Sequence, residues 1–470
     1  MPESISFRGN SNRGSLQLVH PCCRKVPVVS TAPAATRRTL LTLGVPVYVE
    51  LLSGVIAGVI DTVWVARLGG AAVGAVAVAT TLENVLLGVI LMANVGGTVL
   101  IADALGRGRR ADVAAVVRAV GVLWLVVAPV VGVGGFLLRE PIARLLAGGE
   151  GEVFRLTAEF FAVAFPGTAV FFAQNVVDGI FKGTGDTRTP MRTAVLAGGL
   201  ILVLDPLLIY GVGPLPRMGV QGAALGMLAG RAVALCVSLV LLRRRRLTAG
   251  AGAPAALRLP AALRGVLRTG LPASGDFVLR MGISAVLVGI VARFGEDPLA
   301  AYGIGIKAMF FVTMAFYAVR QAGGILTARA RGAGQAAETV IGRQSVLLAT
   351  LVGAGAGLLL AVGGRGLMGL FSDSPGVVDS GAVLLVYLFP YLLLLAGVVG
   401  IGGVFTGGGR ASSLFWVTLV GAVVQIPLAL GLSAIPALGV EGVWLSMSVG
   451  AAAQYVMSYA LFRRYFPAPP

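Results

Sequence analysis

The chain has 470 residues, of which 57% are hydrophobic and 12% are charged, with a mean hydropathy of +0.91 and a formal net charge of +17. This composition is far more apolar than that of a soluble globular protein, so it predicts an integral membrane protein. The positive charge does not indicate a nucleic-acid partner, because the basic residues are scattered among successive loops without a binding motif. The spacing of Cys22, Cys23 and Cys236 suits neither a zinc site nor a disulfide framework.

The chain begins with residues 1–38, which lack a long apolar stretch and hold one acid, Glu3. We expect a disordered N-terminal extension there, and a transit peptide, a plain tail and a misassigned start codon all fit its composition. Apolar runs follow, each long enough to cross roughly 30 Å of hydrocarbon as a helix. They predict transmembrane helices at about 44–66, 73–103, 113–138, 156–181, 190–211, 218–242, 264–293, 299–328, 345–370, 380–406, 411–433 and 438–462.

The second half of the chain repeats the first. Pro46 and Gly106 recur as Pro272 and Gly332, both at a spacing of 226 residues. Duplicated helical halves are typical of alternating-access transporters, and an even number of spans per half gives both copies the same orientation. We therefore predict an all-α membrane fold of two pseudo-symmetric six-helix lobes with a cavity between them. The expected segments are a first lobe at 39–242, a basic linker at 243–263, a second lobe at 264–463 and a tail at 464–470.

The basic residues fall overwhelmingly in alternate loops, on one side of the predicted bundle. The positive-inside rule then places both termini in the cytoplasm of a multi-pass protein, most simply in a bacterial-type plasma membrane. The run Arg243–Arg246 anchors the sixth helix on this face and also suits contact with anionic lipid headgroups.

Several carboxylates lie within the predicted spans, where an unpaired charge costs several kcal/mol and usually serves function. Asp61 and Asp205 have no acidic counterpart in the second half, where the repeat places Leu287 and Ala429. We expect Asp61 and Asp205 to bind the coupling ion, H+ or Na+, in one lobe. Glu50 precedes Asp61 by eleven residues, about three helical turns, so both should share a helix face.

Further polar residues within the spans are candidates for lining a cavity or for holding helices together. Asp276 and Arg280 stand four residues apart, which predicts a salt bridge on one helix. Lys307 and Arg320 are possible partners of acids in the opposite lobe. The candidates for the cavity wall are Glu50, Glu83, Gln174, Asn175, Asp178, Lys307 and the aromatic Tyr302.

The motifs of the chain resemble those of the multidrug and toxic compound extrusion (MATE) family over residues 40–465. The matching stretches are GVPVYVELLSGVIAGVIDTVWVARLGG, IADALGRG with its echo TARARGAG, FKGTGDTRTPM, LDPLLIYG and MGVQGAALG. The resemblance implies a V-shaped pair of lobes that exports amphipathic, often cationic compounds, driven by inward H+ or Na+ flow, with no other cofactor. It puts the coupling acids at Asp61 and Asp205.

The chain also departs from the family pattern. Ile201 stands where members commonly have Asn, and Met227 where Thr is frequent. Arg280 and Leu395 occupy positions at which the NorM-like branch carries acids, which favours the DinF-like branch with coupling in the first lobe.

Other functions compete less well. An enzyme would need a nucleophile with its base or a metal-ligand set, and the single histidine, His20, lies in the extension. A lipid-linked oligosaccharide flippase of the same superfamily would need a strongly cationic cavity, for which Arg280, Lys307 and Arg320 are the candidates. A channel would give no reason for two related lobes. We expect a monomeric secondary transporter for small drug-like molecules.

Overall fold

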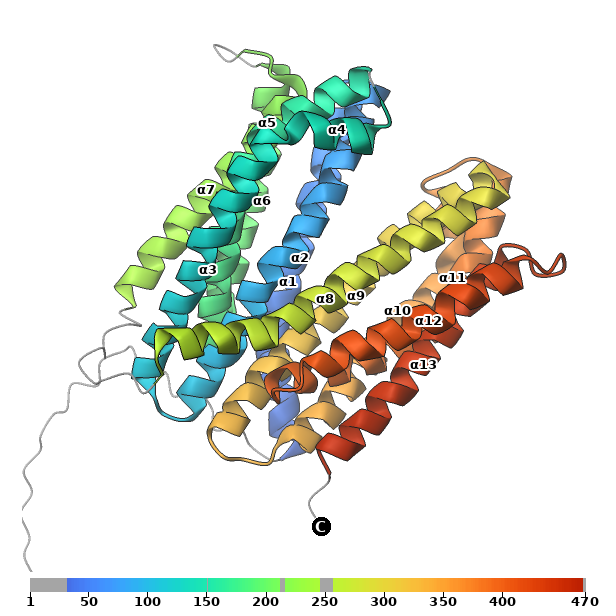
Figure 1. Cartoon of the computed structure of the whole chain (residues 1–470). Coiled ribbons are helices and arrows are strands. Elements are labelled where there is room, and N and C mark those ends of the chain that lie inside the picture. Colours follow the sequence, from blue (N-terminus) through green and yellow to red (C-terminus); the bar gives the residue numbers. More distant parts are fainter. Residues whose placement is uncertain (1–31, 150, 212–215, 246–256, 468–470) are drawn as a thin grey trace, which may run out of the picture.

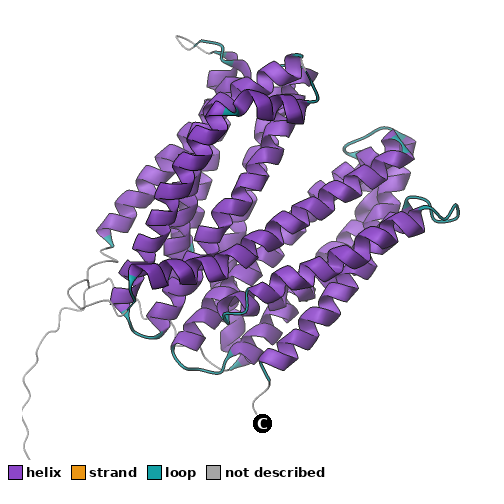
Figure 2. Cartoon of the chain, viewed as in Figure 1, coloured by secondary structure: helices purple, strands orange, loops and turns teal. Residues whose placement is uncertain are grey.

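In a computed structural model, residues 32–149, 151–211, 216–245 and 257–467 are described, and within these ranges the chain forms helices joined by short loops, without strands (Figures 1 and 2). The first lobe contains α1 (Pro33–Ala66), α2 (Gly70–Gly106), α3 (Arg110–Leu137), the short α4 (Arg139–Ala147), α5 (Glu152–Gly183), α6 (Arg188–Tyr210) and α7 (Gly219–Arg244). The second lobe contains α8 (Leu259–Val291), a single 3-10 turn (Ala292–Phe294), α9 (Glu296–Gly332), α10 (Glu338–Gly369), α11 (Pro375–Gly407), α12 (Ser412–Ser433) and α13 (Glu441–Tyr465).

The twelve long helices confirm the predicted fold class. Eleven of them are long and apolar enough to cross a membrane, and the more polar α13 completes the second set of six. Most helices extend several residues beyond the predicted spans, because hydropathy marks only the part in hydrocarbon and the helices continue into the headgroup region. α1 begins at Pro33 instead of residue 44, so it includes the last residues assigned to the extension. The short α4 was not predicted. Residues 1–31, with His20, Cys22 and Cys23, and the linker residues 246–256 lie outside the described ranges.

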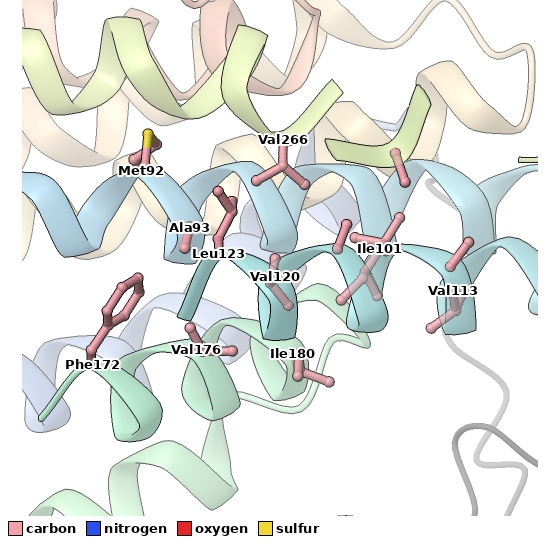
Figure 3. Packing of buried hydrophobic residues seen from close by; sticks show 14 of the residues in the cluster. Met92, Ala93, Ile101, Val113, Val120, Leu123, Phe172, Val176, Ile180 and Val266 are labelled. Atoms are coloured by element: carbon pink, nitrogen blue, oxygen red, sulfur yellow. The ribbon is translucent and has the colours of Figure 1, made fainter. Parts of the chain in front are cut away.

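The two lobes form a V (Figure 1). They touch at the end where the C-terminus lies and diverge toward the opposite end. Each lobe also packs the first part of its neighbour's leading helix. Leu40, near the start of α1, is buried in a cluster of second-lobe side chains, and Val266, near the start of α8, is buried among first-lobe residues (Figure 3). The lobe boundary therefore does not coincide with the start of the repeat.

The backbones of the two lobes approach closely at a crossing of α2 and α9 near their last turns. A Cβ on Gly106 would meet the backbone carbonyl of Arg329, and one on Gly332 would meet that of Asp103. The repeat spacing of 226 residues relates Gly106 to Gly332 and also Asp103 to Arg329, so this contact is pseudo-symmetric. Because lipid provides little hydrophobic drive between helices, close backbone packing of this kind is a main source of association. The crossing therefore holds the base of the V.

Replacing Gly106, one of the two glycines at this crossing, should weaken the contact between the lobes at the base of the V. Gly106→Ala introduces a methyl group where the α9 backbone lies, and such overpacking typically costs about 1–3 kcal/mol. We expect a lower melting temperature for the purified protein in detergent. Gly121→Ala, in α3, is the matched control because nothing lies within 4 Å of its Cβ. Equal melting temperatures for the two variants would contradict the role of the crossing.

Candidate functional site

The structure brings Asp61 and Asp205 together inside the first lobe. Asp61 lies in the last part of α1 and is 3% exposed, and Asp205 lies in α6 and is fully buried. Their carboxyl groups are within hydrogen-bonding reach of each other. Among the described residues, no donor serves Oδ1 of Asp61 or either oxygen of Asp205. Two carboxyl groups in contact cannot both stay ionised in an apolar interior unless a cation lies with them. At least one negative charge of the pair must therefore be neutralised for the arrangement to be stable.

Local sequence explains how the pair is held. Pro206 follows Asp205 directly and has no backbone N–H to donate within α6, which frees a carbonyl one turn earlier. Gly226 of α7 packs against Oδ1 of Asp205, where any side chain would collide with the carboxyl group. Near the ends of α6 and α1, the hydroxyl of Tyr210 donates to the main-chain carbonyl oxygen of Trp64 at 2.6 Å. This hydrogen bond joins α6 to α1.

A pocket lies next to this pair, between α2, α5 and α7. Its wall is mostly apolar and aromatic, with two charged side chains, Glu83 and Arg231, both of which interact electrostatically with Asp61. Arg231 lies 4.3 Å from the ring centre of Phe171. The lining residues are Ala79, Leu82, Glu83, Leu86, Phe160, Phe161, Ala164, Phe165, Gly167, Thr168, Phe171, Ala224, Met227, Leu228 and Arg231. The chemistry of this wall suits an amphipathic molecule with a charged group, and in this conformation the cavity, of about 40 Å³, has room for a few water molecules.

Glu50 does not join Asp61, although both are on α1. Its Oε1 accepts from Nζ of Lys182 at 2.6 Å, and the same ammonium group donates to Oε1 of Gln321 in the second lobe at 3.2 Å. The eleven residues between Glu50 and Asp61 correspond to about 16 Å along a helix at 1.5 Å per residue. The shared face that the sequence predicts therefore serves two separate polar clusters.

The second lobe has a charge cluster of its own around Asp276. Arg280 and Arg320 bind its two oxygens at 3.1 and 3.0 Å, and the hydroxyl of Thr418 donates to Oδ1 at 2.5 Å. The Asp276–Arg280 salt bridge is thus present as predicted, whereas Arg320 bonds within its own lobe and not across to Glu83 or Asp178. With every oxygen of Asp276 occupied, this cluster has no vacant position for an ion.

The other predicted cavity residues lie apart from the Asp61–Asp205 pair. The main-chain carbonyl oxygen of Asn175 accepts a hydrogen bond from Nδ2 of Asn94 at 2.6 Å, which joins α5 to α2. Tyr302 is buried in the second lobe, with its ring stacked on Trp444 at 5.3 Å. Lys307 is exposed on α9, away from the first-lobe pocket.

The second-lobe positions that correspond to the acid pair are apolar. Leu287 and Ala429 are both buried in one hydrophobic cluster of that lobe. The repeat therefore has one lobe with a carboxyl pair and one with hydrocarbon at the same place, as the sequence comparison of the two halves indicates.

Three residues that contribute to these polar clusters could not be predicted from the sequence. Gly226 has no signal beyond its place among many small residues. Lys182 lies at the end of an apolar run, where a basic residue is interpreted as one of the loop charges that determine topology. Gln321 carries no charge, so nothing in its neighbourhood marks it as a partner of a lysine in the other lobe.

A family model described as MatE matches residues 46–207 and 272–430, which together exceed half of the chain. The chain belongs to the multidrug and toxic compound extrusion family, and it is accordingly a transporter and not an enzyme.

Individual relatives agree with this assignment. A probable multidrug resistance protein NorM from Thermotoga maritima is 26% identical over 87% of this chain and 89% of the relative. The DNA damage-inducible protein F from Escherichia coli is 25% identical over 91% and 92%. The structure of a MOP superfamily transporter from Pyrococcus furiosus superposes with a TM-score of 0.84, at 21% identity, over 92% of this chain and 96% of that one. The last comparison shows that the fold is shared.

The Asp276 cluster should be important for stability. Asp276→Asn leaves two buried guanidinium groups without their counter-charge, and removing one partner of a buried pair typically costs about 3–5 kcal/mol. We expect a marked fall in the melting temperature in detergent. The control is Asp379→Asn, whose partner Arg365 is 78% exposed, and an exposed pair is worth about 0–1 kcal/mol. An Asp276→Asn protein as stable as the control would refute this account.

Proposed function

We propose that the chain is a multidrug efflux antiporter that exports amphipathic or cationic compounds in exchange for H+ or Na+. The observation that carries the proposal is the contact between the carboxyl groups of Asp61 and Asp205, buried in the first lobe without donors among the described residues. Relatives named as multidrug resistance proteins support the export of drugs.

The proposed cycle follows from electrostatics at this pair. When Asp61 and Asp205 hold a proton or Na+, their negative charge is neutralised and the pair is stable in its apolar surroundings. When the ion leaves, the negative charge attracts a cationic compound toward the adjoining pocket, where Glu83 adds to the negative potential and Arg231, which lies over the Phe171 ring, reduces it. Ion and compound thus compete for one charge, which is the requirement for exchange.

Both lobes of this transporter come from one chain, so we propose that the monomer is the working unit, with both termini in the cytoplasm. The alternative function, a lipid-linked oligosaccharide flippase, needs free positive charge. Arg280 and Arg320 both bind Asp276, which leaves less positive charge available than the sequence suggests.

Neutralising one acid of the pair should abolish exchange but not folding. Asp61→Asn keeps the size of the side chain and removes its ability to bind and release the ion, so we expect normal expression with dye efflux from cells reduced to the level of cells lacking the transporter. Glu159→Gln, which removes an acid bound by Arg155 near the start of α5, should transport normally. Full efflux by the Asp61→Asn protein would contradict the assignment.

The driving ion can be tested with purified protein in vesicles. We expect dye transport when the gradient of the coupling ion, H+ or Na+, is imposed alone. We expect no transport when both gradients are absent, because the ion must reload the carboxyl pair in each cycle. Fluorescence of an entrapped dye reports the rate. Equal rates with and without the two gradients would show that transport is not coupled to either ion.

A further inference from the structure

A second group of ionisable side chains lies in the first lobe, near its contact with the second. It consists of Glu50 on α1 with Asp178 and Lys182 on α5. Their side chains are withdrawn from solvent, with Lys182 5% and Glu50 12% exposed, and Asp178 as a residue is 9% exposed. The proposed exchange at Asp61 and Asp205 does not use any of them.

The charges in this group do not balance if both acids are ionised. Lys182 donates its hydrogen bonds to Glu50 and Gln321, and it interacts with Asp178 only through long-range electrostatic attraction. The group that hydrogen-bonds to Asp178 is the neutral amide of Gln174, which also donates to Ser238 of α7, and the charged groups that act on Asp178 are Glu50 and Lys182. Two carboxylates with one ammonium leave a net negative charge in a low-dielectric interior, which is costly.

Gln174 provides an independent indication of how the charge is removed. Its Nε2 donates to Oδ1 of Asp178 at 2.9 Å and to the hydroxyl oxygen of Ser238 at 3.3 Å. Its Oε1 is buried and has no donor among the described residues, while the residue is only 9% exposed. A buried acceptor without a donor is costly, and a protonated Asp178, whose Oδ1 lies 2.9 Å from Nε2 of the same amide, would bring an O–H donor to this group.

A metal ion fits this group less well than a proton. Lys182 already lies 2.6 Å from Glu50, so a metal held by the two carboxylates would sit beside an ammonium group that repels it. A proton needs no additional space and turns Asp178 into a donor. We propose that Asp178 is a second proton-binding site of this transporter, distinct from the Asp61–Asp205 pair and placed where Lys182 reaches across to the other lobe.

The site is inferred from charge and hydrogen bonding in the structure. Only the role of its proton during transport rests on the proposed function. Binding is a simple protonation, in which the Asp178 carboxylate takes a proton from water and forms an O–H bond. Lys182 connects this site with Gln321 of α9, so a conformation with the lobes parted at the base would break that link and expose the site.

Infrared spectroscopy of the purified full-length protein tests the proposal directly, because a neutral carboxylic acid has its own C=O stretching band. The starting protein is the Asp61→Asn, Asp205→Asn double variant, in which the other acid pair is silent. We expect a neutral-acid band at neutral pH that shifts on exchange into D₂O. Adding Asp178→Asn should remove one carboxyl equivalent of this band, and Glu50→Gln should remove it as well, because one carboxylate then matches the one ammonium group of Lys182. Asp178→Glu should instead keep the band and shift it, which identifies Asp178 as the carrier, and Glu159→Gln, which removes an acid paired with Arg155, should leave the band unchanged.

The other outcomes overturn the proposal. An unchanged band after Asp178→Asn, or an unshifted band in the Asp178→Glu protein, would show that Asp178 does not carry the proton. Loss of the band on addition of Na+ would identify a metal site instead. If Asp178→Asn does not fold, Asp178→Glu serves as the test, since the longer acid must shift the band. The spectrum is independent of transport, so failure here is distinguishable from failure of the proposed antiport.

Discussion

The high cost of an unpaired charge inside a membrane is the constraint on which this structure depends. Three clusters of buried acids meet it in different ways. Asp276 is fully paired with two arginines and a hydroxyl, and Glu50 has the ammonium group of Lys182. Asp61 and Asp205 lie against each other without a hydrogen-bond donor for Oδ1 of Asp61 or for either oxygen of Asp205 among the described residues, and Arg231 acts on Asp61 only through space. The charges around Asp276 are neutralised permanently by groups fixed on the protein, whereas the Asp61–Asp205 pair still has a negative charge to be neutralised, which is the basis of the ion exchange that we propose.

The pseudo-symmetric scaffold makes this difference useful. The lobes share one architecture and meet in a crossing where Gly106 and Gly332 play equivalent parts. On this common frame the first lobe holds the carboxyl pair, and the second holds apolar side chains in the same place. In the exchange that we propose, a change in the charge of one lobe would alter the balance between two bodies that are otherwise alike.

Much of the site could be predicted from sequence. Asp61 and Asp205 stand out because a carboxylate inside an apolar run is rare and the second repeat lacks them. The separation of Glu50 from Asp61 could not be predicted, since helical periodicity defines a face but not the position of the neighbouring helices along it. Tyr302 illustrates the same limit, because an aromatic side chain suits a substrate pocket and a packed core equally well, and only its stacking on Trp444 decides for the core.

The sequence by itself determined the class of the fold, the number of long helices, the two-lobed organisation and the identity of the asymmetric acids. These follow from hydropathy and repetition, which are properties of single helices in lipid. The tertiary structure decided which charges meet. It joined Lys182 to Glu50 and Gln321, gave Asp276 two arginines, and placed Asp61 against Asp205. Such pairings depend on how distant helices are packed, because an ion pair or a shared proton requires contact within a few ångströms.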